Sequence, residues 1–267
     1  MSWLLIVSVA HLMNAGAFLV DKFLLARAVP KPVVYAFWIG VLGLLALLLL
    51  PFGFAIPTPA VFGLALLAGC TFEIALVFFF IALRYLDASR VIPVVGGLQP
   101  ILIFAFAYTF LQERLSQTEV AAFALLVLGS ILISYENGKR SIAATTRARR
   151  GWYAAVGAAL FFSISFTVTK SVFDATIFFS GLAWIRVGAF LTVILFLLYA
   201  PWRRDILEKQ DFPSGALRML FVVGQVGGAL ASVLLQYAVK LATPTLVSAM
   251  QGLQYAFLFV LAVVLGR

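Results

Sequence analysis

Long apolar runs alternate with short polar segments along the whole chain. Each run can span a hydrocarbon core of about 30 Å, because about twenty helical residues rise about 1.5 Å each. The pattern predicts nine membrane-spanning helices, at residues 3–20, 33–50, 60–83, 91–111, 118–135, 152–172, 181–200, 214–238 and 244–266. Prolines mark several of the connections between the runs. The sequence therefore predicts an all-α polytopic membrane protein.

One run and its polar flanks recur in the second half of the chain. A shift of 155 residues places the Gly-Leu-Gln of 97–99 on the Gly-Leu-Gln of 252–254, and no gap is needed between 82–112 and 237–267. The shared order of polar segment, spanning run and Gly-Leu-Gln predicts an internal repeat.

The longest polar connection, residues 136–151, separates five predicted helices from four. Because five is odd, a second copy would enter the membrane from the opposite side, which predicts two inverted repeats. We expect a first five-helix repeat at 1–135 and a second repeat at 152–267, whose tenth helix is missing from this chain. Two explanations stay open: a longer protein that supplies the helix, or a native nine-helix form in which a homodimer covers the gap.

The composition agrees with a membrane protein and limits other functions. Hydrophobic residues make up 64% of the chain and charged residues 11%, whereas soluble domains contain about 25% charged residues. A single cysteine, Cys70, excludes an intramolecular disulfide, and one histidine with one cysteine offers no clustered metal site, so no cofactor is expected. The net charge of +9 lies mostly in short loops between spans, which favours lipid headgroups and not nucleic acid as the partner.

Lysine and arginine are distributed unequally between the two sides of the predicted bundle. Fifteen of the 19 lie in or beside the connections that follow helices one, three, five, seven and nine. The others are Arg114, Lys170, Arg186 and Lys240. By the positive-inside rule, the N-terminus lies outside and the 136–151 loop lies in the cytoplasm. A plasma (inner) membrane of the bacterial type is the expected location.

Three segments resemble the EamA-type members of the drug/metabolite transporter superfamily. They are WLLIVSVAHLMNAGAFLVDKFLLAR at 3–27, ASRVIPVVGGLQPILIFAFAYTFLQERLS at 88–116 and LVSAMQGLQYAFLFVLAVVL at 246–265, which are similar to the family's first helix, its fourth helix and the matching helix of the second half. The resemblance implies ten helices in two five-helix repeats, with a substrate cavity at their interface. The sequence departs from the family in two ways: many relatives have a cytoplasmic N-terminus, and the tenth helix is absent here.

Glu73 lies near the middle of the third predicted helix. A charged side chain at the bilayer centre costs about 3 kcal/mol on insertion scales, and such residues usually face a cavity or a partner. Glu73 therefore either couples transport to protons or contacts substrate, or it is a hydrogen-bonded structural carboxyl. Both interpretations stay open.

Two basic residues lie inside the second-half helices. Arg186 is five residues into the seventh helix, and its planar guanidinium suits a carboxylate or phosphate, although pairing with Glu73 or a carbonyl explains it equally well. Lys170 lies near the end of the sixth helix, where extension to the headgroups is the simpler explanation and a place at the cavity edge the alternative.

The repeated glutamines, Gln99 and Gln254, are expected to point inward, because an unsatisfied amide in lipid is costly. His11 and Asn14 lie three residues apart on the first helix and are further candidates for a cavity lining. Hydrogen bonds between helices would explain all four equally well. The expected cavity backbone, where helices are broken, comprises Pro93, Gly96, Gly97, Pro100 and Gly252.

A secondary transporter that moves a small metabolite by alternating access is the leading functional hypothesis, with protons as the candidate coupling ion. The alternative is a lipid-handling or non-transporting membrane protein with the same helical repeat. A membrane enzyme is disfavoured, because one mid-membrane Glu and one His are poor catalytic material and the chain has no GxSxG or phosphate-binding loop. A GxxxG pair, Gly224 and Gly228, predicts close helix packing.

Overall fold

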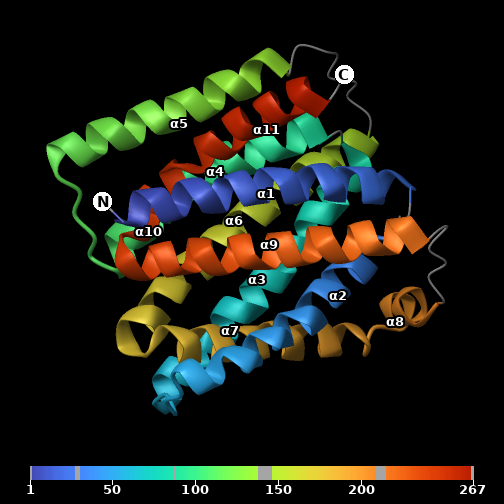
Figure 1. Ribbon diagram of the computed structural model, residues 1–267, viewed down its shortest axis with the longest axis horizontal. Helices are drawn as coiled ribbons and strands as arrows, with labels where there is room; N and C mark the ends of the chain where they lie inside the picture. The colour runs from blue at the N-terminus through green and yellow to red at the C-terminus, as the bar shows by residue number, and fades with distance from the viewer. Residues whose placement is uncertain (1, 28–30, 87, 138–145, 209–214, 266–267) are drawn as a thin grey trace.

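A computed structural model describes residues 2–27, 31–86, 88–137, 146–208 and 215–265 (Figure 1). Residues 138–145 of the basic connection 136–151 lie outside them. The elements are α1 (Ser2–Arg27), α2 (Pro32–Gly43), the 3₁₀ helix η1 (Leu44–Phe52), α3 (Pro59–Tyr85), α4 (Ala88–Phe110), α5 (Gln117–Asn137), α6 (Thr146–Ala175), α7 (Phe178–Phe196), α8 (Ala200–Leu207), α9 (Gly215–Leu241), α10 (Pro244–Ala249) and α11 (Gln251–Leu265). Within the described ranges every regular element is helical.

Eight helical segments in the described part of the chain are long and apolar enough to cross a membrane, and α5 contributes a shorter apolar stretch at Gln117–Gly129. The prediction of an all-α polytopic membrane protein is confirmed. Two local features differ from the predicted spans. The segment after α7 forms the short helix α8, and the ninth predicted span is divided into α10 and α11 at Met250. Hydropathy does not predict α8, because its two arginines lower the mean hydropathy of the segment. One side of the helix is nevertheless apolar and buries Ile206.

Two helices begin with the same Thr-Pro signal. Thr58 precedes Pro59 at the start of α3, and its hydroxyl accepts a hydrogen bond from the Val61 amide at 3.4 Å. Thr243 precedes Pro244 in the same way at the start of α10. Pro suits the first turn of a helix because its missing N–H would be unpaired there in any case. The side-chain oxygen satisfies one of the remaining amides.

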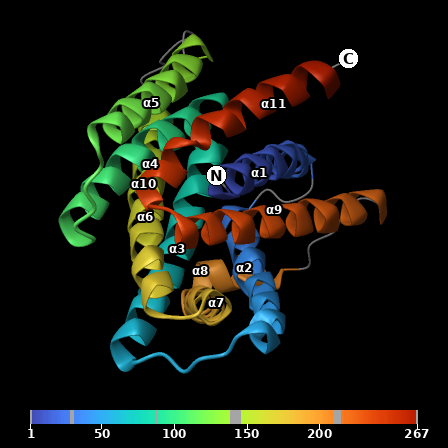
Figure 2. The same ribbon diagram turned by 60° about the vertical axis from the view of Figure 1, so that its left-hand side comes forward.

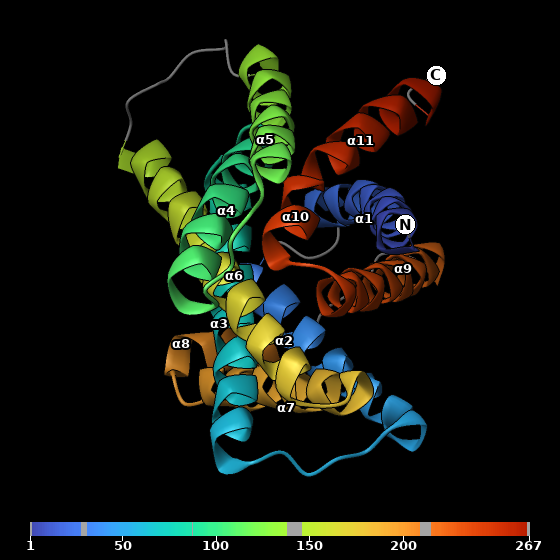
Figure 3. The same ribbon diagram turned by 90° about the vertical axis from the view of Figure 1, so that its left-hand side faces the viewer.

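The helices pack as two groups. In the first, called the α3 group, α3 packs against α6 and α7, α4 packs against α6, and α2 packs against α7. In the second, called the α1 group, α1 lies between α9 and α11 (Figure 2). Figure 3 shows α1, α9, α10 and α11 on one side and α4, α5 and α6 on the other. Packing within each group is far more extensive than packing between the groups.

Glycines allow close helix packing inside both groups. A Cβ atom on Gly69 of α3 would lie 2.1 Å from the Ile185 carbonyl oxygen of α7, and one on Gly188 would lie 2.7 Å from Leu66 Cα. In the α1 group, a Cβ on Gly224 of α9 would lie 2.6 Å from Val20 of α1. Close backbone approach through small residues is a main source of helix association in membranes. The sequence-based prediction for the GxxxG pair of α9 is thus confirmed.

We expect Gly69→Ala to destabilise the protein and Gly63→Ala, on the same helix, to leave it unchanged or slightly more stable. The new methyl group would meet backbone atoms at position 69, and overpacking of this kind typically costs about 1–3 kcal/mol. At position 63 nothing lies within 4 Å of the added Cβ, and alanine favours the helix. Thermal midpoints of the two variants in detergent test the difference. Equal midpoints would show that the α3–α7 contact is loose.

Candidate functional site

Glu73 lies in the interior of the α3 group. Its side chain has no exposed surface, and neither carboxyl oxygen has a hydrogen-bond partner among the described residues. The absence of a side chain at Gly40 of α2 makes room for it, since a Cβ there would lie 3.2 Å from Glu73 Oε1 and 2.6 Å from Val193 of α7. An ionised carboxylate in such surroundings would be very costly, which favours the neutral acid.

Arg186 of α7 interacts electrostatically with Glu73. Its side chain is 8% exposed, and its Nη2 donates a hydrogen bond to Ser232 Oγ of α9 at 2.8 Å. Its guanidinium carbon lies 5.1 Å from the centre of the Phe72 ring. Ser232 also accepts a hydrogen bond from Gln236 Nε2 at 3.2 Å. The guanidinium is therefore held by a neutral hydroxyl of the α1 group.

The structure brings two further predicted residues together within the α1 group. His11 Nδ1 of α1 lies 3.2 Å from Gln254 Oε1 of α11, and both side chains are buried. The Gln254 amide nitrogen is buried and has no hydrogen-bond partner in the described part of the chain. Asn14 is half-buried three residues along α1. This contact agrees with the interhelical interpretation of both His11 and Gln254, and it leaves one amide donor unused.

Helix α4 meets α11 at Tyr255. Tyr255, next to Gln254, donates a hydrogen bond to the Ile92 carbonyl oxygen at 3.0 Å. The ring is accommodated by Gly96, where a Cβ would lie 1.3 Å from the Tyr255 hydroxyl oxygen. The half-buried Gln99 contributes its backbone carbonyl, which accepts a hydrogen bond from Ser163 of α6 at 3.1 Å.

The expected break in α4 is not observed. The helix runs without interruption through Pro93 and Pro100, and Gly97 and Pro100 are buried. The interruption lies instead between α10 and α11, two residues before Gly252. A proline ring removes one hydrogen bond and displaces one carbonyl, and neighbouring helices can compensate for this in a bundle.

Lys170 forms an ion pair with Asp174 one turn later on α6, at 2.8 Å. Near it lies Glu113, which the sequence indicated only as the charged end of the fourth run. Glu113 Oε2 accepts a hydrogen bond from Thr245 Oγ1 of α10 at 3.0 Å, and Glu113 Oε1 is buried without a partner. Burial raises the pKa of the Glu113 carboxyl, against the opposing effects of the hydrogen bonds from Thr243 and Thr245 and the field of Lys170.

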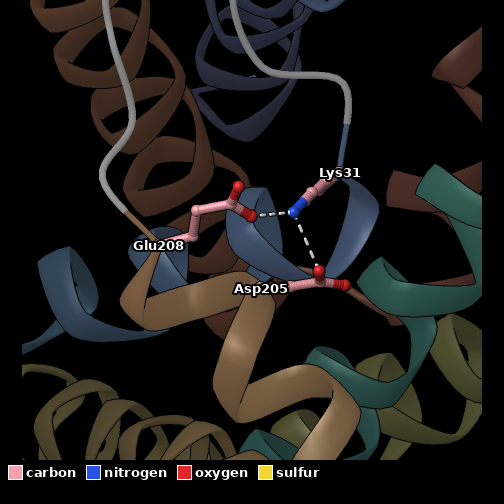
Figure 4. A network of polar contacts seen from close by, with 3 residues as sticks. All are labelled: Lys31, Asp205 and Glu208. Carbon is pink, nitrogen blue, oxygen red and sulfur yellow. Dashed lines mark hydrogen bonds and ion pairs between the residues drawn. The ribbon is translucent and has the colours of Figure 1, made fainter.

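A charged cluster joins α2 to α8 at the opposite end of the bundle. Lys31, at the start of α2, forms an ion pair with Asp205 at 2.9 Å and a second one with Glu208 (Figure 4). The hydrogen bonds that Lys31 donates to Asp205 and Glu208 raise the pKa of the lysine. Beside the cluster is a cavity of about 190 Å³, lined by Lys31, Pro32, Val33, Val77, Ile81, Arg84, Tyr85, Trp202 and Asp205.

Comparison with known proteins supports the fold and identifies the family. No curated protein matches the chain. One solved structure, a crystal structure of a protein, superposes with a TM-score of 0.70 at 20% identity, over 99% of this chain and 88% of its own. That likeness concerns the fold alone. The EamA-like transporter family matches residues 1–135, just over half of the sequence. The chain, an integral membrane protein, therefore belongs to the EamA-like transporter family.

Proposed function

We propose that this membrane transporter is a secondary active carrier, which moves a small polar metabolite by alternating access and uses protons as the coupling ion. The observation that carries the proposal is the buried Glu73, whose carboxyl has no hydrogen-bond partner among the described residues. It packs at Gly40 of α2, one turn from Gly43, where Arg186 packs. An acid at membrane depth that is neither exposed nor hydrogen-bonded can bind and release a proton when its surroundings change. The chain also provides the substrate path: His11, Asn14, Gln99 and Gln254 supply its polar lining.

Inverted repeats at 1–135 and 152–267 are part of this proposal. Support comes from matched packing: α3 lies on α6 as α9 lies on α1, and α4 lies on α6 as α11 lies on α1. If the repeat relates α1 to α6, α3 to α9 and α4 to α11, each packed pair in one repeat arrangement corresponds to a packed pair in the other. The hydrogen bond from Tyr255 to the Ile92 carbonyl oxygen then joins α11 to α4, the two helices that the repeat relates. A carrier built in this way alternates between its two sides by rocking one group against the other.

Polar contacts join the two proposed repeats at both ends of the bundle. Lys31 of the first repeat holds Asp205 and Glu208 of the second at one end, and Glu113 holds Thr245 at the other. Alternating access requires that each contact opens in turn. Because the ion pairs are near the surface, they break at little cost, which suits a reversible closure.

The bundle is proposed to place the Lys31 end in the cytoplasm of a bacterial-type plasma membrane, with surrounding lipid as its permanent partner. The excess of Lys and Arg on that side is the support. A cysteine at Leu207 of α8 should then be protected from an impermeant thiol reagent in intact cells, whereas one at Phe54 should react, in a background with Cys70→Ser. Both positions are exposed, so access alone decides the result. The reverse labelling would invert the assignment.

Removal of the proton-binding group should abolish coupling without unfolding the protein. In proteoliposomes screened with a metabolite panel, Glu73→Gln should reduce uptake driven by a pH gradient to the level seen without a gradient, because an amide cannot release a proton. Glu119→Gln is the matched control, since Glu119 is a half-buried acid in the first turn of α5 that accepts hydrogen bonds from Ser116. Unchanged proton dependence in Glu73→Gln would remove Glu73 from the coupling role.

The Lys31 contact predicts a local effect. Lys31→Gln should speed hydrogen exchange in the amides of α8 a few-fold, whereas Lys31→Arg should not, because the arginine keeps the charge that both acids need. The contact should persist from neutral into alkaline pH. Because its pKa is raised, Lys31 stays protonated, and so positively charged, until the pH exceeds that raised value. Exchange measured by mass spectrometry at matched pH tests this. Equal α8 exchange in Lys31→Gln and the wild type would show that the ion pairs do not hold α8.

A further inference from the structure

We propose that Arg186 is a positioning residue that exchanges partners: it holds Ser232 of α9 while Glu73 is protonated, and it moves to Glu73 when the proton leaves. This inference rests on the proposed function and specifies how a proton would move the helices. The structure shows the first of the two arrangements. Arg186 donates to Ser232 at 2.8 Å, while both Glu73 oxygens remain without a hydrogen-bond partner.

The second arrangement follows from the surroundings of Glu73. Gly40 and Val193 face it from α2 and α7, and the buried stretch of α6 that packs on α3, residues 163–169, contains hydroxyl and apolar side chains. Among the described residues, Arg186 is the charged group whose field reaches the carboxyl. When Glu73 gives its proton to water, the new carboxylate therefore has one cation to pair with. A buried carboxylate without a partner would be far costlier than one paired with the guanidinium.

The exchange would act on helix packing because Ser232 belongs to the other group. Helix α9 packs mainly on α1, and its packing against the α3 group is sparse. The Arg186–Ser232 bond is one of several polar contacts between the groups; another joins Gln225 of α9 to Tyr35 of α2 at 2.8 Å. Lys240 of α9 also donates hydrogen bonds to carbonyl oxygens at the end of α6. Loss of the Arg186 bond would remove one polar contact that holds the α1 group against the α3 group and would shift the balance towards their separation. The gain or loss of one proton thus biases a two-state arrangement.

The exchange can be measured without a known substrate. Spin labels on cysteines that replace Tyr153 of α6 and Met219 of α9 report the separation of the two groups, in a background with Cys70→Ser; both positions are exposed. In the wild type, the label separation should increase as pH rises. Glu73→Gln should keep the short separation at every pH, since it cannot be deprotonated. Ser232→Ala should favour the long separation even at low pH, with the separated population increased about tenfold or more.

Two control variants distinguish the exchange from a general loss of packing. Ser232→Thr keeps the hydroxyl and should restore the wild-type pH response. Gln236→Ala removes the other donor to the same hydroxyl and should leave the response intact. A Ser232→Ala protein with the wild-type response would overturn the exchange, whereas proton coupling by Glu73 would still stand. No pH response in the wild type would contradict the exchange and the proton coupling together. An absence of transport alongside the expected label shifts would instead count against the proposed carrier function alone.

Discussion

The cost of placing a hydrogen-bonding or charged group in hydrocarbon governs the interior of this protein. Backbone groups meet that cost by forming helices throughout the membrane-spanning part. Most buried side chains meet it too: Ser163, Ser165 and Thr167 donate to carbonyl oxygens of their own or neighbouring helices. Glu73 differs from them, because neither of its carboxyl oxygens has a hydrogen-bond partner among the described residues, and it lies where glycine at position 40 makes room for a carboxyl. A group kept unpaired in such surroundings is more consistent with a function than with stability.

The division into two helix groups allows the Glu73 carboxyl to affect how they pack together. Glycine contacts bring α3 close to α7 and α9 close to α1, so each group is closely packed. Packing between the groups is less extensive than packing within them, and it includes both an apolar cluster and polar contacts. The polar contacts can exchange partners, whereas packed apolar surfaces cannot slide easily. Arg186 is placed at that boundary, near an acid of its own group and bonded to a hydroxyl of the other. A local change of charge can therefore be transmitted to the relative position of whole helices.

Much of the fold could be predicted from the sequence, since spanning length and hydropathy are local properties. The polar residues inside the spans were also recognisable, because each breaks an apolar run. Their partners were not. His11 and Gln254 are 243 positions apart, and Ser232 is unremarkable in its own helix, so these contacts depend on how the helices pack. Glu113 was interpreted as the end of a run, whereas the structure turns it towards Thr245. The continuity of α4 through two prolines depends likewise on its neighbours.

The most direct test of this account is the protonation state of Glu73 in the resting protein. Infrared difference spectroscopy of wild-type and Glu73→Gln protein in lipid at neutral pH measures the carbonyl stretch of a neutral carboxylic acid. The account predicts a band of this kind at a frequency typical of an acid without strong hydrogen bonds, present in the wild type and absent from the variant. A carboxylate signal that disappears on substitution, with no acid band, would show that Glu73 is ionised and already paired, which would contradict the account.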